Sequence, residues 1–424
     1  MKLVVSKSKL SGSVRIPGSK SHTIRATAIA SLAEGTSHVR EPLVASDTLS
    51  AFDAYRLLGA ESLQQNDWVI RGVGGRPRVP DNVIDVGNSG TTLYVALGSA
   101  ALVDGCSVFT GDGQIRRRPV QPLIDALNGL GANVESTRGN GMAPIIVRGP
   151  MRGGEIKLDC GQTSQYLTSL LINCPLAMGD TIIEAENLTE KPYIEMTLRW
   201  LAEQGIELAN DDFRRFRIPG GQSYRAFDKA IPADFSSATF FMCAAAITGS
   251  DLTLLGLDMS DTQGDKAVAD MLAKMGATVE ALPDGLRVIG GPLRGAQFDL
   301  GDTPDALPAL AVTACFAEGE TRLVNVPQAR LKETDRIAVM REELEKMGAD
   351  IDELPDGLVI RGSHLTPTYL HGHSDHRVIM ALAIAGLRMC GGETTVYTAE
   401  ALSVTFPTFV ELMNSVGAEM TVLD

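Results

Sequence analysis

Six short polar segments of this chain each precede an apolar, Ala-rich stretch. They are GSKSHTIR (18–25), GNSGTT (87–92), GQTSQY (161–166), ADFSSA (233–238), DTPDAL (302–307) and HSDHR (373–377). Ser, Thr, Asn and Asp are favoured N-cap residues, so each segment predicts the start of a helix. Helix N-termini attract anions through unpaired N–H groups and the helix dipole. Converging starts would therefore form a site for phosphate or carboxylate groups.

Several of these segments also contain side chains that N-capping does not explain. These are Lys20, Arg25, Gln165, His376 and Arg377. For any one segment taken alone, a capped helix is an equally good interpretation. Together, the added cations and hydrogen-bond donors favour anion binding.

Two further basic clusters fit the same chemistry. Arg116, Arg117 and Arg118 follow the Gly-rich turn TGDGQ, and RLKETDR (330–336) places Glu333 among cations. On a helix start, Lys332 and Arg336 would share one face, and flanking cations would lower the pKa of Glu333. A solvated charge run and a surface ion-pair network are the alternative interpretations.

Glycines repeat at a spacing near 70 residues and indicate how these segments are positioned. One series follows predicted helices at Gly59, Gly131, Gly205, Gly276, Gly348 and Gly417, and a second lies at Gly35, Gly105, Gly179, Gly249, Gly319 and Gly392. Both fit the left-handed position at a helix end. Pro-Asp-Gly at 283–285 and 355–357 predicts hairpin turns.

The repeat predicts six mixed α/β units in two domains of three units each. We expect one domain over 19–230 and the other over 231–424 together with 1–18, whose strand from Leu3 to Ile16 completes it. The chain would cross between domains near 17–19 and near 230–232, which makes a hinge.

Composition excludes several classes of protein. The chain has 424 residues and a net charge of −14, which argues against nucleic-acid and acidic-membrane partners. Its six scattered cysteines predict free thiols in a reducing compartment. No apolar run approaches about 18 residues and the start lacks a signal-peptide pattern, so we expect a cytoplasmic protein, and a monomer.

Sites for metals and nucleotides are not indicated. His371, His373 and His376 lie close in sequence but lack accompanying acidic or cysteine ligands at metal spacing. The chain also has no P-loop and no GxGxxG after a strand.

The motifs GSKSHTIR, GNSGTT, TGDGQIRRRP, TSQY, KPYIEMT, LKETDR and SDHR, in this order, resemble the enolpyruvyl transferases over the whole chain. The resemblance implies a two-domain inverse α/β barrel, each domain with three βαβαββ repeats and helix N-termini facing an interdomain cleft. It also implies transfer of the enolpyruvyl group of phosphoenolpyruvate to the 5-hydroxyl of shikimate 3-phosphate by addition and elimination, in aromatic amino acid biosynthesis. No cofactor or metal is implied, and glyphosate is the implied inhibitor.

Matching motifs imply the site residues. For shikimate 3-phosphate they are Lys20, Ser21, Arg25, Thr163, Ser164, Gln165, Tyr193, Asp305, Gln328 and Lys332. For phosphoenolpyruvate they are Lys20, Gly90, Arg118, Gln165, Arg336, His376 and Arg377. The implied catalytic residues are Lys20, Asp305, Glu333 and His376, with Asp305 and Glu333 as candidates for base and acid. Without substrate, we expect the cations to repel one another.

Three positions depart from the family pattern. Val404 stands where many members have Lys, and Gln328 replaces an Asn. Glu190 occupies a place that is often Ser in the 3-phosphate pocket, and we expect its carboxylate to point away from a bound anion.

Two alternatives remain at this point. A sister branch of the family uses a UDP-sugar, but it carries Cys in the loop before Arg-Pro and Asn after the first Lys, where this chain has Gly113 and Ser21. A non-catalytic repeat scaffold would leave Lys20, Asp305, Glu333 and His376 unexplained.

Overall fold

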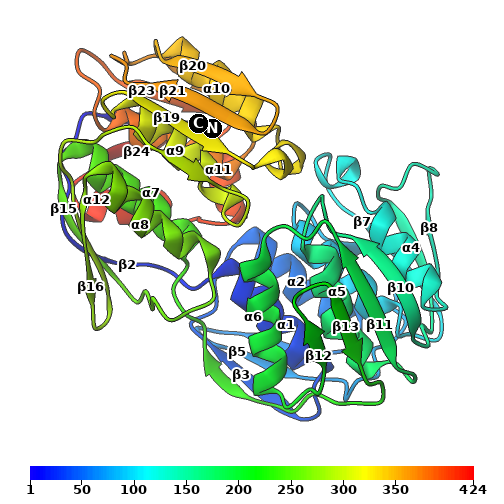
Figure 1. The fold of residues 1–424 in the computed structure, drawn as a ribbon. Helices are drawn as coiled ribbons and strands as arrows, with labels where there is room; N and C mark the ends of the chain where they lie inside the picture. Colours follow the sequence, from blue (N-terminus) through cyan, green and yellow to red (C-terminus); the bar gives the residue numbers. More distant parts are fainter. The chain divides into compact units, whose positions relative to one another are not determined.

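The computed structural model describes all 424 residues, which divide into two compact units (Figure 1). One unit consists of Gly18–Ile231, and the other of Met1–Pro17 with Pro232–Asp424. The chain therefore passes from one unit to the other twice. None of its helices is long and apolar enough to cross a membrane.

The unit Gly18–Ile231 contains three four-stranded sheets with the same strand order. They are β14 (Asp228–Ala230), β3 (Thr36–Arg40), β5 (Trp68–Arg71), β4 (Glu61–Gln64); β6 (Ile84–Asp85), β7 (Cys106–Thr110), β9 (Ile145–Arg148), β8 (Asn133–Ser136); and β10 (Gly154–Asp159), β11 (Thr181–Glu186), β13 (Arg215–Ile218), β12 (Ala209–Asp211). In each sheet the first two strands are parallel and the other neighbours antiparallel.

The other unit repeats this plan. Its sheets are β2 (Ser11–Arg15), β15 (Asp251–Leu255), β17 (Gly285–Ile289), β16 (Thr278–Leu282); β18 (Gln297–Asp299), β19 (Glu320–Val324), β21 (Gly357–Arg361), β20 (Asp350–Leu354); and β22 (Tyr369–His371), β23 (Thr394–Tyr397), β1 (Lys2–Ser6), β24 (Glu419–Leu423). The six sheets confirm the predicted mixed α/β class.

The N-terminal segment forms two strands instead of the one expected from Leu3 to Ile16. β1 lies antiparallel between β23 and β24, whereas β2 pairs in parallel with β15 of a different sheet. The intervening residues redirect the chain, and the Leu10 N–H donates to Ser250 Oγ at 2.8 Å. Because β1 pairs with β24, the two chain ends lie together in Figure 1.

Two helices join the strands of each repeat. They are α1 (Lys20–Leu32), α2 (Ser46–Leu57), α3 (Gly90–Ala100), α4 (Gln121–Gly129), α5 (Gln165–Asn173), α6 (Lys191–Glu203), α7 (Phe235–Thr248), α8 (Ala267–Met275), α9 (Leu307–Cys315), α10 (Arg336–Lys346), α11 (His376–Gly386) and α12 (Phe409–Ser415). In one unit α3 packs against α1 and α5, and in the other α9 packs against α7 and α11.

The odd-numbered helices are buried on all sides and form the cores. All residues of α9 and α11 are buried, as is every residue of α7 except Thr248. In α1, α3 and α5 the residues that are not buried are Lys20, Ser21, Thr91 and Gln165. In α1, α3 and α5, therefore, only residues at the start of each helix are open to solvent.

The predicted helix-ending glycines of the first series all have positive φ, from 73° at Gly205 to 116° at Gly276, which confirms them. In the second series, Gly35, Gly249 and Gly319 also have positive φ. The prediction is wrong for Gly105, Gly179 and Gly392, which do not. There α3 ends several residues earlier, α5 runs into a 3-10 turn with Pro175, and Gly391 takes the left-handed conformation.

Both predicted Pro-Asp-Gly hairpins form. Leu282 pairs with Gly285 and Leu354 with Gly357, so each turn has two residues. A Cβ at Gly285 would overlap the Leu254 carbonyl oxygen, so the backbone approach there requires glycine.

Candidate active site

A buried cluster of charges lies at the helix starts of the unit Pro232–Asp424. Arg336, the first residue of α10, is 1% exposed and donates to three carboxylates. Its Nη1 lies 2.8 Å from Asp305 Oδ1, its Nη2 lies 2.6 Å from Glu333 Oε2, and its Nε lies 2.8 Å from Asp375 Oδ2. A buried charge is costly unless it is paired and hydrogen-bonded, and these carboxylates provide the pairing.

Asp305 joins this arginine to a second one. Its other oxygen, Oδ2, lies 2.8 Å from Arg377 Nη2, so one carboxylate bridges two guanidinium groups. Arg377 follows His376 at the start of α11, where Asp375 caps the helix by accepting from the Arg377 N–H at 2.9 Å. His376 is also buried.

Arg336 and Arg377 each have a carboxylate partner, which offsets the expected repulsion between these two cations. Burial alone would lower the pKa of Arg336, but Asp375, Glu333 and Asp305 raise it above its ordinary value. Arg336 therefore stays charged at any pH at which the protein is folded.

The predicted helical face shared by Lys332 and Arg336 is wrong. Asp335 caps α10 by accepting from the Ala338 N–H at 3.1 Å, so the helix begins at Arg336 and Lys332 lies before it. The surface-network alternative is also wrong for Arg336, which is buried. Nearby, Gln328 is buried and donates to the Gly301 carbonyl at 2.9 Å.

Asp265 adds a buried carboxyl near this cluster. It lies in a short 3-10 turn and accepts from Ser236 Oγ at the start of α7. Burial and the nearby charge of Asp305 raise the pKa of Asp265 above its ordinary value, which Arg377 partly opposes. The surrounding sequence, TQGDK, contains no motif that predicts a buried carboxyl close to Asp305 and Arg377.

In the unit Gly18–Ile231, Lys20 begins α1 and its Nζ lies 3.1 Å from Asp47 Oδ2. Asp47 is buried in α2 and was not singled out from the sequence. The lysine and its partner come from consecutive helices of the first repeat. As in the other unit, a cation at a helix start has a carboxylate partner.

Arg25 links three helices. Its Nε donates to Thr197 on α6 at 2.9 Å, its Nη2 to Thr168 on α5 at 3.3 Å and to the Tyr193 carbonyl at 3.0 Å, and its Nη1 to the Ser21 carbonyl at 3.0 Å. Burial lowers the pKa of Arg25 to about 10. These bonds use four of the five N–H donors of a guanidinium, so Arg25 holds the helix starts together as well as offering a charge.

The structure brings Gly90 and Arg118 together. A Cβ added to Gly90 at the start of α3 would overlap Arg118 Nη1. Arg118 is buried, whereas its neighbours Arg116 and Arg117 are exposed. The alternative of a solvated charge run therefore holds for the first two arginines and not for the third.

Glu190 points toward Ser164, so the expectation that it points away is wrong. Both residues are buried, and Glu190 Oε2 accepts from Ser164 Oγ at 3.1 Å and from its N–H at 3.4 Å. Glu190 has φ 56° at the N-cap of α6, which turns its carboxylate to the start of α5. Anions favour such helix starts, and here the anion is one of the protein's own. Thr163 and Gln165 flank Ser164, and Tyr193 follows Glu190 on α6.

Val404 ends a 3-10 turn (Ala399–Val404) and packs against the apolar core. Its apolar side chain offers no charge to an anion. All six cysteines are free, and only Cys106 and Cys390 are exposed.

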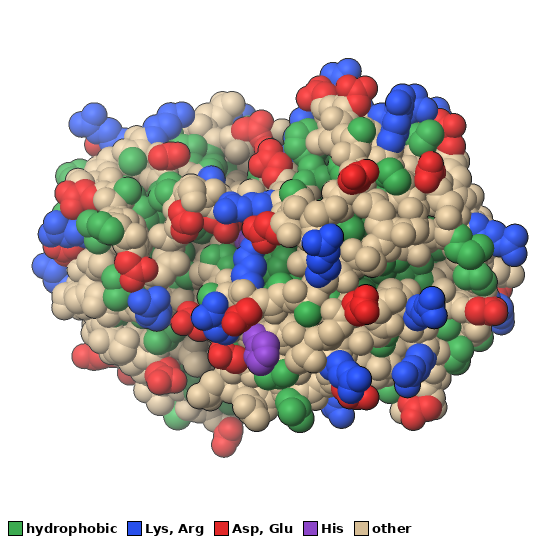
Figure 2. Space-filling view, turned by 90° about the horizontal axis from the view of Figure 1, so that it is seen from below, with side chains coloured by type: hydrophobic (Ala, Val, Ile, Leu, Met, Phe, Trp, Pro, Cys, Tyr) green, Lys and Arg blue, Asp and Glu red, His purple; other side chains and the backbone are tan.

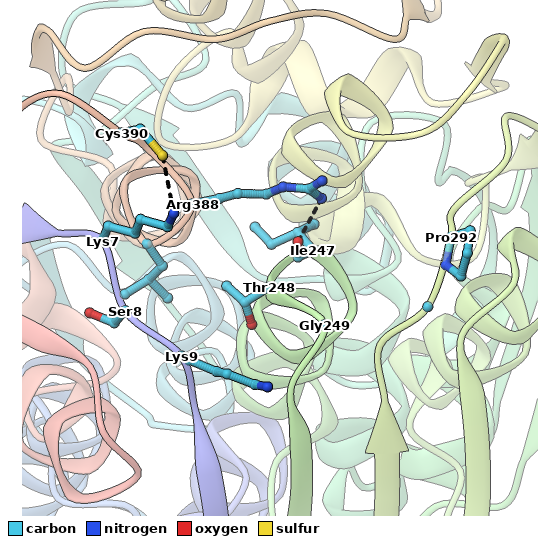
Figure 3. Close-up of a pocket in the computed structure, with 11 residues that line it drawn as sticks. Lys7, Ser8, Lys9, Ile247, Thr248, Gly249, Pro292, Arg388 and Cys390 are labelled. Atoms are coloured by element: carbon cyan, nitrogen blue, oxygen red, sulfur yellow. Dashed lines mark hydrogen bonds between the residues drawn. The ribbon is translucent and has the colours of Figure 1, made fainter.

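A separate cavity of about 690 Å³ lies beside Gly249 and Arg388, at the other end of α7 from Asp234 (Figure 3). Lys7 Nζ lies 3.1 Å from Cys390 Sγ, and Arg388 Nη1 donates to the Ile247 carbonyl at 2.6 Å. The 14 residues of α7 span about 21 Å. The cavity therefore contains none of the predicted site residues.

The repeated α/β fold and the paired charges at its helix starts fit the enolpyruvyl transferases, which the sequence motifs resemble. The family model for EPSP synthase (3-phosphoshikimate 1-carboxyvinyltransferase) matches residues 4–413. The chain belongs to the EPSP synthase family.

Individual relatives agree with this assignment. The chain is 55% identical over 424 residues to the 3-phosphoshikimate 1-carboxyvinyltransferase of Ruminiclostridium cellulolyticum, covering 100% of both chains. It is 56% identical over 422 residues to that of Acetivibrio thermocellus, covering 99% of each. The solved EPSP synthase of Acinetobacter baumannii is 30% identical with a TM-score of 0.84, covering 99% of this chain and 100% of that chain.

The chain is therefore a transferase of the shikimate pathway. It moves the enolpyruvyl group of phosphoenolpyruvate to the 5-hydroxyl of shikimate 3-phosphate. These findings confirm the resemblance and the implied reaction, and they exclude a non-catalytic scaffold.

Proposed function

We propose that the site residues implied by the sequence act on the two substrates in the roles given above. Shikimate 3-phosphate is bound by Lys20, Ser21, Arg25, Thr163, Ser164, Gln165, Tyr193, Asp305, Gln328 and Lys332. Phosphoenolpyruvate is bound by Lys20, Gly90, Arg118, Gln165, Arg336, His376 and Arg377. The observation that supports this proposal most strongly is the bridge from Arg336 through Asp305 to Arg377.

This bridge suits a reaction between two anions. Bidentate guanidinium groups bind carboxylate and phosphate, and fixing them in advance lowers the entropic cost of bringing the reactants together. Asp305 holds both guanidiniums, and its proposed role is to accept the proton of the 5-hydroxyl. The Asp305 carboxylate keeps Arg336 and Arg377 charged and oriented. A substrate anion then replaces part of the contact between the carboxylate and each guanidinium.

Addition forms a bond between the 5-oxygen and C2 of phosphoenolpyruvate. Asp305 accepts the hydroxyl proton, and Glu333 donates a proton to C3. Elimination returns a proton from the resulting methyl group to Glu333, breaks the bond from C2 to the phosphate oxygen and restores the double bond, and the proton held by Asp305 leaves with the phosphate. Lys20 and His376 stabilise the negative charge on the leaving phosphate.

We propose that glyphosate competes with phosphoenolpyruvate beside Gly90. In Gly90→Ala the new methyl group must displace the Arg118 guanidinium. Such overpacking costs about 1–3 kcal/mol. Because glyphosate is longer than phosphoenolpyruvate, we expect its inhibition constant to rise about 5- to 150-fold, with a smaller rise in the KM for phosphoenolpyruvate.

Gly113→Ala is the matched control, since a Cβ at Gly113 would meet nothing within 4 Å. Inhibition titrations against phosphoenolpyruvate compare the three forms. Equal inhibition constants for the natural protein and Gly90→Ala would show that Gly90 does not line the site.

Glu190 is proposed to oppose binding of the 3-phosphate, because both anions compete for the Ser164 donors. Two like charges about 4 Å apart repel by about 1–4 kcal/mol near a protein surface. We expect Glu190→Gln to lower the KM for shikimate 3-phosphate about tenfold, with little change for phosphoenolpyruvate, in steady-state assays.

Glu195→Gln is the control, because Glu195 is exposed on the same helix. A higher KM for shikimate 3-phosphate in Glu190→Gln would mean instead that the carboxylate helps to build the phosphate pocket.

We further propose that the protein acts as a monomer in the cytoplasm. Its free cysteines are typical of a reducing compartment. Large exposed apolar side chains such as Leu63, Met178 and Tyr369 are scattered along the chain, and acidic and basic side chains are interspersed on the face shown in Figure 2. Light scattering of the purified protein gives its mass directly.

A further inference from the structure

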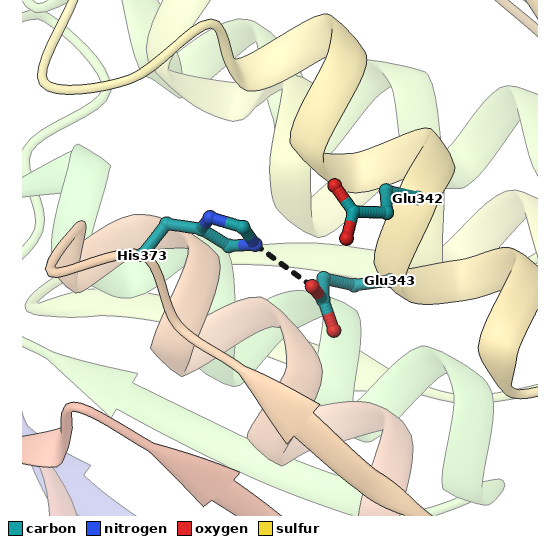
Figure 4. A group of neighbouring side chains, drawn as sticks. All are labelled: Glu342, Glu343 and His373. Carbon is teal, nitrogen blue, oxygen red and sulfur yellow. Dashed lines mark hydrogen bonds and ion pairs between the residues drawn. The ribbon is translucent and has the colours of Figure 1, made fainter.

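Glu343, on α10, is a fully buried carboxylate outside the proposed substrate contacts. Its Oε1 lies 2.7 Å from His373 Nε2 (Figure 4). The same oxygen lies 2.7 Å from Lys346 Nζ, and Oε2 accepts from the His371 N–H at 2.9 Å. Burial alone would raise the pKa of Glu343, but the hydrogen bonds from His373, Lys346 and His371 lower it to about 2. Glu343 is thus an anion with three donors.

The segment that Glu343 holds has an unfavourable backbone conformation. His373 and Ser374 have φ of 53° and 55°, in the left-handed region that residues other than glycine rarely adopt. Such conformations persist only where surrounding contacts impose them. The His373 N–H donates to His371 Nδ1 at 2.9 Å, and the Asp375 N–H donates to the Gly372 carbonyl at 2.9 Å.

This segment leads directly into the proposed phosphoenolpyruvate site. Asp375 follows Ser374, accepts from Arg336, and caps the helix that begins with His376 and Arg377. Arg336 and Glu343 lie on the same helix, about 10.5 Å apart along its axis. Helix α10 therefore holds the segment 371–377 at two points, through Arg336 and Asp375 at one end and through Glu343 at the other.

We propose that Glu343 is a positioning residue, which sets the place of Asp375, His376 and Arg377 through His373 and the backbone of His371. The inference rests on the proposed roles of Arg336, His376 and Arg377 toward phosphoenolpyruvate. Glu343 itself touches no reacting group.

A metal site explains the same cluster less well. Glu342, Glu343 and His373 place possible ligand atoms within 4.8 Å of one another. However, the Lys346 ammonium lies 2.9 Å from Glu342 and 2.7 Å from Glu343, so both carboxylates already have a cation between them. Figure 4 shows His373 bonded to Glu343 and not to Glu342.

The test compares Glu343→Gln with Glu342→Gln, its exposed neighbour that contacts the same lysine. A displacement of about 1 Å can cost about 100-fold in rate. We expect Glu343→Gln to lower kcat/KM for phosphoenolpyruvate by about 10- to 100-fold, with the KM for shikimate 3-phosphate within about twofold. Glu342→Gln should change neither. An unchanged kcat/KM for phosphoenolpyruvate, or an equal loss for both substrates, would overturn the proposal.

A second pair of variants keeps the test decisive if Glu343→Gln does not fold. His373→Gln retains a donor that can reach Glu343, whereas His373→Leu removes it in a side chain of similar size. The Gln variant should keep most of the phosphoenolpyruvate activity that the Leu variant loses, and equal loss in both would overturn the proposal. Arg377→Gln, assayed alongside, separates failure of the positioning role of Glu343 from failure of the proposed phosphoenolpyruvate site. A normal KM for phosphoenolpyruvate in Arg377→Gln would contradict the proposed site itself.

Discussion

Glu333→Gln should lower kcat by roughly 10²–10⁴-fold while binding of both substrates survives. The Glu333 side chain is 8% exposed, and its Oε2 lies 2.6 Å from Arg336 Nη2. Glutamine keeps the size and one acceptor oxygen but has no proton to transfer, and general acid–base catalysis contributes rate factors of this size. Rates of phosphate release and equilibrium binding of shikimate 3-phosphate measure the two effects separately.

Glu345→Gln is the control, since Glu345 is exposed on α10 and pairs only with Arg341 in an i,i+4 contact. Turnover near the natural rate in Glu333→Gln would exclude a role in proton transfer. Loss of binding together with turnover would show that Glu333 acts by holding Arg336.

Arg336→Gln should lower both stability and activity. The substitution removes the cation that Glu333, Asp375 and Asp305 share, and Asp305 keeps Arg377 as its guanidinium partner. Removing one partner of a buried pair costs about 3–5 kcal/mol. We also expect the use of phosphoenolpyruvate to be lost. Urea unfolding gives the stability change, with Arg341→Gln as the exposed control on the same helix, expected to cost at most about 0.5 kcal/mol.

The pH dependence of this variant has a definite sign. Without the guanidinium, the neighbouring carboxylates repel one another in the folded state, and protonation relieves this repulsion. The stability deficit should therefore shrink as the pH falls from 7 to 5. A deficit that stays constant over this range, or one as small as in Arg341→Gln, would contradict the view that Arg336 neutralises the cluster.

The repeat of six α/β units was predictable because the chain must reverse after each helix. A left-handed turn there strongly favours glycine, so six such turns leave six glycines at a regular spacing. The predicted left-handed glycine is wrong at Gly105, Gly179 and Gly392 for a local reason. At these three places the helix ends without a left-handed conformation at the predicted glycine. The division of the N-terminal segment into two strands depends on pairing with residues about 240 and 390 positions away, which no local pattern specifies.

The sequence motifs identified the cationic residues of the candidate site, but they identified only some of its carboxylates. Lys20, Arg118, Arg336 and Arg377 stand in recognisable motifs. Their neighbours Asp47 and Asp265 come from other elements, and only packing brings them close. Asp375 lies within a quoted motif, but its double role as helix cap and partner of Arg336 follows from the fold.

Glu190 and Lys332 are residues whose local conformation could not be predicted from the sequence. The Glu190 carboxylate was expected to avoid a phosphate pocket, but the Ser164 N–H and hydroxyl attract it. Lys332 was placed on a helix because spacing alone does not reveal that Asp335 is the N-cap. In both cases a competing local interaction decides the geometry.

Release of inorganic phosphate from phosphoenolpyruvate, measured with each acceptor in turn, tests the assigned reaction most directly. With shikimate 3-phosphate we expect release at a rate that saturates in both substrates and forms one enolpyruvyl product per phosphate. With UDP-N-acetylglucosamine we expect none. Release with the UDP-sugar and not with shikimate 3-phosphate would contradict the assignment.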